Sequence, residues 1–246
     1  MADSGAIEPA RSFERAAAAY ESARPSYPSA LLDFLPVDVG STVLDLGAGT
    51  GKLTRVLARR YRHVIAVEPL DGMRAILETV VPEAESHAGA AESIPLTDSS
   101  VDAVFAAQAF HWFANDEAIA EIARVLRPGG VFAVVWNESV DPSPLPDPYR
   151  ARIKELFADG RLAPGEDDDR FAAIARGPFG ELHEETVMHE QVQDRDSALA
   201  YLSSVSLIAR LPDDERLATM AELRALLPVG EYRFSIRATV RWAVRT

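Results

Sequence analysis

A glycine-rich turn between residues 42 and 51 contains the residue types in this sequence that could hold a ligand. The segment reads Thr-Val-Leu-Asp-Leu-Gly-Ala-Gly-Thr-Gly, and apolar residues recur at helical spacing after it. This order predicts a strand, a tight turn and a helix. Gly47, Gly49 and Gly51 carry no Cβ, so the backbone can approach a ligand closely. The helix that follows presents free amide groups to that ligand.

Two better-known glycine loops do not fit this turn. A phosphate-binding P-loop requires a glycine five residues before Gly51 and a serine or threonine after Lys52, but the chain has Leu46 and Leu53 there. A dinucleotide-binding turn requires its third glycine three residues after Gly49, where the chain has Lys52. The spacing therefore excludes both loops.

The pattern that does fit is Asp45 followed by three alternating glycines, with Glu68 at the end of a second predicted strand, residues 64–68. It resembles motif I and the second-strand acid of class I S-adenosylmethionine (SAM) dependent methyltransferases. The resemblance implies that the glycine turn contacts the methionine part of SAM and that Glu68 binds both ribose hydroxyls. An ionised carboxylate can accept two such hydrogen bonds. The alternative is a glycine turn that serves only tight packing.

Two further segments narrow the resemblance to the small-molecule branch of this family, the type 11 domain group with its trans-aconitate methyltransferase-like members. They are Arg-Pro-Ser-Tyr-Pro at residues 24–28 and Gln-Ala-Phe-His-Trp-Phe at residues 108–113. The resemblance covers residues 13–136 well and the C-terminal third loosely. In the family, the segment with Tyr20, Arg24 and Tyr27 folds over the cofactor. An amphipathic cover helix with a solvent-facing arginine is the alternative.

The resemblance also implies a set of binding residues. The implied cofactor contacts are Tyr20, Arg24, Asp45, Gly47, Ala48, Gly49, Gly51, Glu68, Pro69, Met73, Ala91, Glu92, Gln108, Ala109 and Phe110. The implied substrate residues are Tyr27, His111, Trp112, Trp136, Ser203 and Ser206. Many relatives have an aspartate, which holds the adenine amino group, where this chain has Ala90. The adenine edge is therefore left to backbone groups of Ala91 or to Glu92.

His111 is the candidate catalytic residue. Methyl transfer is an in-line displacement at carbon, so the protein chiefly aligns the acceptor with the methyl group and excludes water. A hydroxyl or ammonium acceptor must also lose a proton, and His111 is the only histidine beside the expected site. A structural hydrogen bond in the turn explains His111 equally well. Aromatic residues such as Phe110, Trp112 and Trp136 can line the cavity and stabilise a sulfonium by cation–π attraction.

Strands and helices alternate along most of the chain. Strands are predicted at residues 42–46, 64–68, 85–88, 101–106, 131–136, 186–192 and 232–242. Helices are predicted at residues 13–20, from 31 to 35, after 51, at 72–80, after an Asn115 cap, and at 149–157, 197–209 and 213–227. This alternation predicts an α/β fold with a doubly wound, mostly parallel seven-stranded sheet, Rossmann-like as in class I methyltransferases. Ligands bind such sheets where the strand order reverses, here between the first and fourth strands.

The last predicted strand alternates apolar residues with arginines. Its apolar face is therefore buried, and an antiparallel C-terminal hairpin would give the arginines Glu184, Glu185 and Glu190 as cross-strand partners. An anion-binding stripe is the alternative. We expect a disordered segment at residues 1–10 and a single SAM-binding domain at 11–246. Within that domain we expect a helical N-terminal lid at 11–35 and a substrate-cap insertion after the fifth strand at 138–180.

Composition limits the partners. The chain of 246 residues carries a net charge of −13, which disfavours nucleic acid and favours a small-molecule substrate. It has no cysteine, and its five histidines lack metal-ligand spacing, so no metal site is expected. No apolar span long enough for a membrane occurs, which predicts a cytoplasmic protein. Arginine greatly outnumbers lysine, which suggests a bacterial source. The oligomeric state does not follow from the sequence.

Two functions are consistent with these residues. The first is SAM-dependent methyl transfer to oxygen, nitrogen or carboxylate of a small molecule, leaving S-adenosylhomocysteine (SAH). The second is a protein of the same fold that uses bound SAM or SAH in another reaction or for regulation. Ala90 favours the second function, whereas the glycine turn and Glu68 favour cofactor binding in both.

Overall fold

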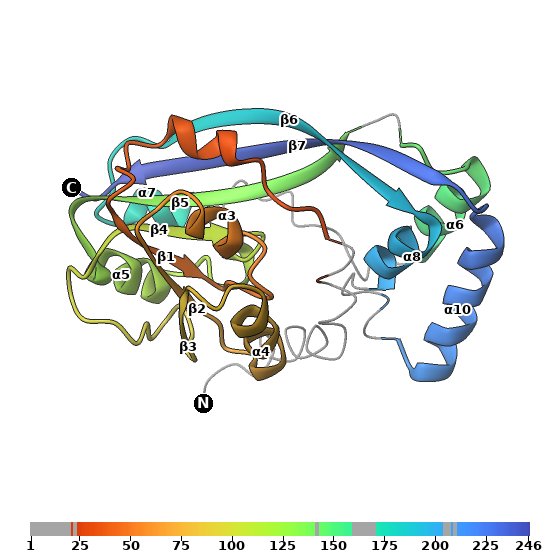
Figure 1. Ribbon diagram of the computed structural model, residues 1–246, viewed down its shortest axis with the longest axis horizontal. Coiled ribbons are helices and arrows are strands. Elements are labelled where there is room, and N and C mark those ends of the chain that lie inside the picture. The colour runs from red at the N-terminus through yellow and green to blue at the C-terminus, as the bar shows by residue number, and fades with distance from the viewer. Residues whose placement is uncertain (1–20, 22–23, 141–142, 159–170, 204–207, 209–210) are drawn as a thin grey trace. The chain divides into compact units, whose positions relative to one another are not determined.

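The computed structural model describes residues 21, 24–140, 143–158, 171–203, 208 and 211–246, and in them a seven-stranded sheet with the order β3-β2-β1-β4-β5-β7-β6 (Figure 1). Its strands are β1 (Thr42–Leu46), β2 (His63–Val67), β3 (Glu85–His87), β4 (Val101–Ala107), β5 (Leu126–Val140), β6 (His183–Asp194) and β7 (Glu231–Val244). The pairs β1–β2, β1–β4, β2–β3 and β4–β5 are parallel. Strands β6 and β7 run in opposite directions in Figure 1. The predicted fold class is confirmed.

Helices accompany the strands in the predicted alternation. The α-helices are α3 (Thr54–Ala58), α4 (Asp71–Val80), α5 (Asp116–Val125), α6 (Asp147–Ala158), α7 (Ala172–Arg176), α8 (Arg195–Ser203) and α10 (Asp213–Leu226), and the 3-10 helices are η1 (Ser29–Phe34) and η2 (Phe110–Trp112). Among the described helices, none combines the length and apolarity that a membrane crossing requires. The Asn115 side chain accepts a hydrogen bond of 2.8 Å from the Ala118 amide, which confirms the predicted cap of α5.

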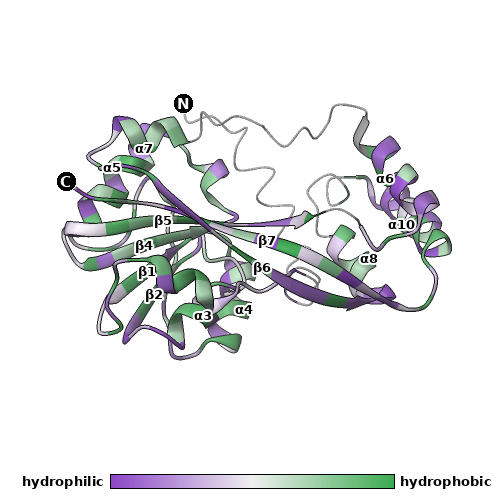
Figure 2. Ribbon diagram, turned by 90° about the horizontal axis from the view of Figure 1, so that it is seen from above, coloured by the Kyte–Doolittle hydropathy of each residue, from purple (hydrophilic) through white to green (hydrophobic). Residues whose placement is uncertain are grey.

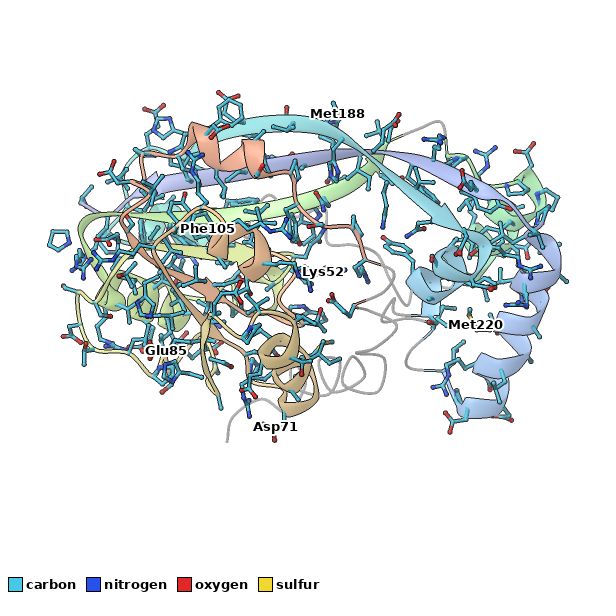
Figure 3. All side chains as sticks on the ribbon, in the orientation of Figure 1. Lys52, Asp71, Glu85, Phe105, Met188 and Met220 are labelled. Carbon is cyan, nitrogen blue, oxygen red and sulfur yellow. The ribbon has the colours of Figure 1, made fainter. Side chains whose placement is uncertain are left out.

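Alternate residues of the central strands enter two different cores. In β4, Val104 and Ala106 belong to the core that includes α5, whereas Ala103 and Phe105 belong to the core that includes α3 and η1. Strands are apolar where both faces are covered, and Figure 2 shows the middle of β4 and of β5 in green. Figure 3 shows Phe105 inside this packing, while Met188 on the edge strand β6 is exposed.

The chain divides into two compact units. The sheet unit comprises residues 26–138, 167–189 and 237–246, and the helical unit comprises residues 1–25, 139–166 and 190–236. The helical unit has its own core, built mainly by α6, α8 and α10. Residues 171–180, which we expected in the cap, group with the sheet unit, and the described residues of 190–236 group with the helices. A single domain with a lid and a cap stays a prediction, and residues 1–10 and the helix at 13–20 lie outside the described residues.

Three local features differ from the sequence prediction. The helix expected from residue 31 is the short 3-10 helix η1, because Pro36 forces Leu35 into extended backbone, with ψ at 136°. Strand β5 begins at Leu126, directly after α5, and its register against β4 shifts before Val131. Helix α7 was not predicted, since its five residues are too few to show a helical period.

The predicted pairing of the C-terminal arginines is confirmed at one position. Arg241 of β7 donates a hydrogen bond to Glu184 of β6, and its guanidinium lies 4.3 Å from the centre of the Phe171 ring. The pairing of Glu185 and Glu190 with arginines stays a prediction. At Arg241, the basic face of β7 is thus occupied by contacts within the sheet unit.

The core between α5 and the sheet provides a test of the packing. Ile122 of α5 is fully buried there. Ile122→Ala should lower the free energy of unfolding by about 2–5 kcal/mol, because the cavity adds to the lost burial, and Ile122→Val by about 0.5–1.5 kcal/mol. Urea denaturation measures both values. Val39→Ala, at an exposed position, is the control. Equal effects of the three substitutions would contradict this packing.

Candidate functional site

The candidate site lies where β1, β2 and β4 end, at the edge where the strand order reverses. Backbone hydrogen bonds continue the pairing of the strands past these ends. The amide of Gly47 donates to the Val67 carbonyl at 2.9 Å, and the amide of Gln108 donates to the Val135 carbonyl at 3.0 Å. The glycine turn and the segment from Gln108 therefore flank one point, as predicted for a ligand site in a doubly wound sheet.

The glycine turn has glycine-specific backbone angles and open space at its central residue, Gly49. Gly47, Gly49 and Gly51 have φ values of 69°, 58° and 88°, which residues with a side chain rarely adopt. A Cβ on Gly47 would lie 2.9 Å from the Ala109 Cβ, so these two segments touch. A Cβ on Gly49 would meet no atom within 4 Å. Of these two glycines, Gly49 is thus the one beside open space.

Glu68 connects the end of β2 to this turn. Its Oε2 accepts a hydrogen bond of 2.8 Å from the Gly49 amide, and its Oε1 accepts one of 2.9 Å from the Leu70 amide. The residue is only 5% exposed. Burial raises the pKa of the Glu68 carboxyl, and the two amide bonds and Arg74 oppose this rise. Each carboxylate oxygen can still accept a further hydrogen bond.

Asp45 is a second buried acid at the base of the same turn. It is 1% exposed, and its Oδ2 accepts a hydrogen bond of 2.7 Å from the Thr54 hydroxyl. Its Oδ1 is buried and has no hydrogen-bond partner among the described residues. Burial raises the pKa of Asp45 to about 7, the Thr54 bond opposes this rise, and the charge of Glu68 adds to it. Such an oxygen lacks a donor that a ligand could supply.

Gln108 and Asn137 form a polar network beside the end of β4. Gln108 has a φ of 54°, and its Nε2 donates to the Asn137 carbonyl at 2.7 Å. Asn137 Nδ2 donates to the Ser26 carbonyl at 3.1 Å, and Asn137 Oδ1 lies 3.4 Å from His189 Nε2. Burial lowers the pKa of His189, which favours the neutral imidazole. Asn137 thus contacts residues from three distant parts of the sequence.

His111 lies in η2, just after β4, with an exposed side chain next to two tryptophans. Its ring centre is 4.6 Å from that of Trp112 and 5.2 Å from that of Trp136. The structure therefore brings these three predicted residues together. Phe110 is different: it is 0% exposed and packs edge-on against Phe113 and Phe132. The expectation that its ring lines a cavity was wrong, because the ring faces the core.

The other cofactor candidates surround the turn to different degrees. Ala48, Met73, Ala91 and Ala109 are buried, whereas Pro69 is exposed. The side chain of Glu92 is already engaged, since its Oε1 accepts a hydrogen bond of 2.8 Å from Asn115 Nδ2. This bond uses only one lone pair of the carboxylate, so both expected adenine contacts, the Ala91 backbone and Glu92, stay predictions.

The remaining predicted residues have other surroundings. Tyr27 is buried in the core with η1. Arg24 belongs to the helical unit, where its guanidinium lies 4.8 Å from the centre of the Tyr201 ring. Ser203 donates its hydroxyl hydrogen bond to the Ala200 carbonyl within α8. Tyr20 and Ser206 lie outside the described residues. Within the part of the chain that the structure describes, no group of three or more acids and histidines could hold a metal ion.

Comparison with known proteins agrees with this geometry. The family model described as a methyltransferase domain matches residues 44–134. An uncharacterized methyltransferase of Mycobacterium tuberculosis is 52% identical over 218 residues, or 88% of this chain and 85% of the relative. A methyltransferase-like protein of Schizosaccharomyces pombe is 36% identical over 220 residues, or 87% of this chain and 84% of the relative.

A solved structure from Anaeromyxobacter dehalogenans, assigned as a type II methyltransferase, has a TM-score of 0.64 and 28% identity to this chain. The match covers 90% of this chain and 97% of that one. The chain belongs to the class I SAM-dependent methyltransferases. The family resemblance drawn from the glycine turn is therefore confirmed, and so is the cofactor that it implies.

The residues present fit this cofactor. SAM carries a sulfonium, an ammonium and two ribose hydroxyls, which are cationic or hydrogen-bond-donating groups. The methyltransferase offers two buried carboxylates, one with an unpartnered oxygen, beside a glycine with open space. Positive groups next to buried acids favour their ionised forms.

Sequence reasoning missed three polar residues of the site in this methyltransferase. Thr54 was read only as part of a helix, although a hydroxyl in the first helical turn can reach back to the acid before the glycines. Asn137 was noted only as the end of a strand, yet a polar residue directly after a buried apolar strand is a signal for the ligand edge. The sequence around His189 carries no such signal, because only the folded structure brings His189 to within 3.4 Å of Asn137.

The raised pKa of Asp45 predicts how stability depends on pH in the cofactor-free protein. Between its ordinary pKa of 3.8 and about 7, the folded state holds a proton that the unfolded state has released. The free energy of unfolding should therefore fall as pH rises through this window and level off above it. Urea denaturation from pH 4 to 8 should show a shallower fall for Asp45→Asn, which cannot titrate.

The control for this measurement is Asp38→Asn, which removes an exposed carboxylate and should keep the wild-type slope. Parallel curves for wild type and Asp45→Asn would show that Asp45 ionises normally.

Proposed function

We propose that this methyltransferase transfers the methyl group of SAM to an oxygen, nitrogen or carboxylate of a small-molecule acceptor. The single observation that supports this most strongly is the pair of buried acids at the glycine turn, Asp45 and Glu68, of which Glu68 accepts a hydrogen bond from the Gly49 amide. Few ligands other than one with both positive charge and hydroxyl donors would compensate two desolvated carboxylates. The net charge of −13 supports a small acceptor over a nucleic acid.

In this proposal the cofactor lies along the strand ends. Glu68 accepts the ribose hydroxyls with the lone pairs that the Gly49 and Leu70 amides leave available. Asp45 Oδ1 receives a donor from the methionine part, and Gly49 gives that part room because it has no Cβ. The adenine lies against the turn that contains Ala91. The buried Ala48, Met73 and Ala109 fill the space around these groups.

The methyl group then faces the segment after β4. Bound SAM supplies a methyl carbon on a good leaving group. The chain therefore has to align the acceptor, exclude water and, for a neutral acceptor, remove a proton. His111 is the proposed base, and the rings of Trp112 and Trp136 hold its imidazole and shield the reacting atoms. Gln108 fixes the backbone of this segment through Asn137.

Product analysis tests the proposed reaction. The protein is incubated with SAM and a panel of carboxylic acids, phenols and amines, and SAH formation is measured together with the mass gain of one CH₂ in the acceptor. Both signals for the same acceptor establish the transfer. Tight SAH binding with no acceptor-dependent SAH release across the panel would instead support the non-transfer use of the cofactor, which the Ala90 position favours.

Glu68→Ala tests the cofactor contact. Two charge-assisted hydrogen bonds of about 1.5–3 kcal/mol each would be lost, so SAH should bind about 10²- to 10⁴-fold more weakly. Titration calorimetry measures this affinity. Glu85→Ala removes a half-exposed acid of β3 and serves as the control. An unchanged affinity of the Glu68→Ala protein would place the ribose elsewhere.

His111→Ala tests the proposed base. With a hydroxyl or ammonium acceptor, kcat should fall by about 10²- to 10⁴-fold, whereas SAH affinity should hardly change. The wild-type rate should decrease at acidic pH, where an imidazole is protonated, and the variant should lack this decrease. His63→Ala, a surface histidine at the start of β2, is the control. A variant that keeps both the rate and the acidic decrease would exclude His111 as the base.

A further inference from the structure

The loop between β3 and β4 is fixed from outside by one arginine of α5. Arg124 makes five side-chain hydrogen bonds to protein acceptors, which is the full number that a guanidinium can donate. Nη2 donates to the Ile94 carbonyl at 2.9 Å, and Nη1 donates to the Leu96 carbonyl at 2.8 Å and to Asp98 Oδ1 at 2.8 Å.

Glu121 completes this arrangement from the same helix. Its Oε1 accepts from Arg124 Nε at 2.7 Å and its Oε2 from Nη2 at 2.8 Å, the paired geometry that a planar guanidinium favours. Oε2 also accepts from the Ile94 amide at 2.9 Å. The Arg124 bond lowers the pKa of Glu121, so the carboxylate stays charged. Both backbone groups of Ile94 are therefore bound by the two side chains.

These contacts act on the turn that precedes Ile94. The Ser93 amide donates to the Ala90 carbonyl at 3.1 Å and closes a tight turn over residues 90–93. The Asn115 side chain holds Glu92 at 2.8 Å, and the buried Ile94 side chain anchors the turn in the core. Helix α5 and its cap Asn115 thus contact the turn at Glu92 and directly after it at Ile94. The turn itself has no side-chain acid at Ala90 with which to contact a ligand.

We propose that Glu121 and Arg124 are positioning residues that determine which base the cofactor must carry, by fixing the backbone of residues 90–93. This inference rests on the proposed function, which places adenine at that turn. Backbone groups read a base edge only when they are held in place, because they cannot adjust as a side chain can. In this chain the α5 clamp provides that rigidity, so the adenine edge is recognised without an acid at position 90.

Base discrimination is the property to measure. In S-inosylhomocysteine the donor and acceptor of the base edge are exchanged relative to SAH, so a rigid turn leaves polar groups unpaired. Wild-type protein should bind SAH about ten- to a hundred-fold more tightly than the inosine analogue. In Arg124→Gln and in Arg124→Lys, which keeps the charge but lacks the planar fork, this ratio should fall close to one.

The readout separates positioning from a merely structural role. Loss of stability weakens the binding of both nucleosides equally and leaves the ratio intact. Glu121→Gln, the mildest of the three changes, should also lower the ratio and serves if an arginine variant does not fold. Arg176→Gln removes an arginine that bonds to Asp116 of the same helix at 2.8 Å without touching the turn, so it should keep the wild-type ratio.

Three results would overturn the inference. A wild-type ratio near one would show that the turn does not read the base, although SAH binding would leave the proposed function standing. A wild-type ratio that folded Arg124 and Glu121 variants retain would show that the clamp only stabilises the loop. Wild-type protein that binds neither nucleoside would overturn both the inference and the proposed function.

Discussion

The Glu68 carboxylate connects the end of β2 to the glycine turn after β1, and the rest of the candidate site depends on this connection. One of its oxygens holds the Gly49 amide and the other holds the Leu70 amide. Because the carboxylate is buried, these bonds are made in a medium that strengthens them. They hold the Gly49 amide beside open space, where the proposed function places the methionine part of the cofactor.

The same burial leaves the two acids of the cofactor-free site without full compensation for their lost hydration. Asp45 and Glu68 both lose hydration, and the charge of Glu68 further disfavours the ionised form of Asp45. A ligand that carries positive charge and hydroxyl donors offsets this penalty, which links cofactor affinity to stability and to pH. The clamp of Glu121 and Arg124 on the loop between β3 and β4 has the reverse character, since its charges are already paired within the protein.

Much of the fold follows from local sequence patterns. The strand and helix periods and the Asn115 cap depend on neighbours in the chain, and each was predicted from them. Features that depend on distant contacts were not. The short helix α7 and the extension of β5 to Val140 have no local signal, and the division into a sheet unit and a helical unit reflects packing among helices that are far apart in sequence.

For the site, the sequence alone determined the glycine turn, the two acids and the order along the chain of the strands that bear them. Each of these depends on residue type and spacing along one chain segment. Tertiary structure decided which side chains remain available to a ligand. It buried Phe110 in the core, engaged Glu92 with Asn115, and brought Asn137 to Gln108. It also joined α5 to the turn at residues 90–93. These outcomes depend on hydrogen bonds and packing between segments whose separation in the chain carries no periodic signal.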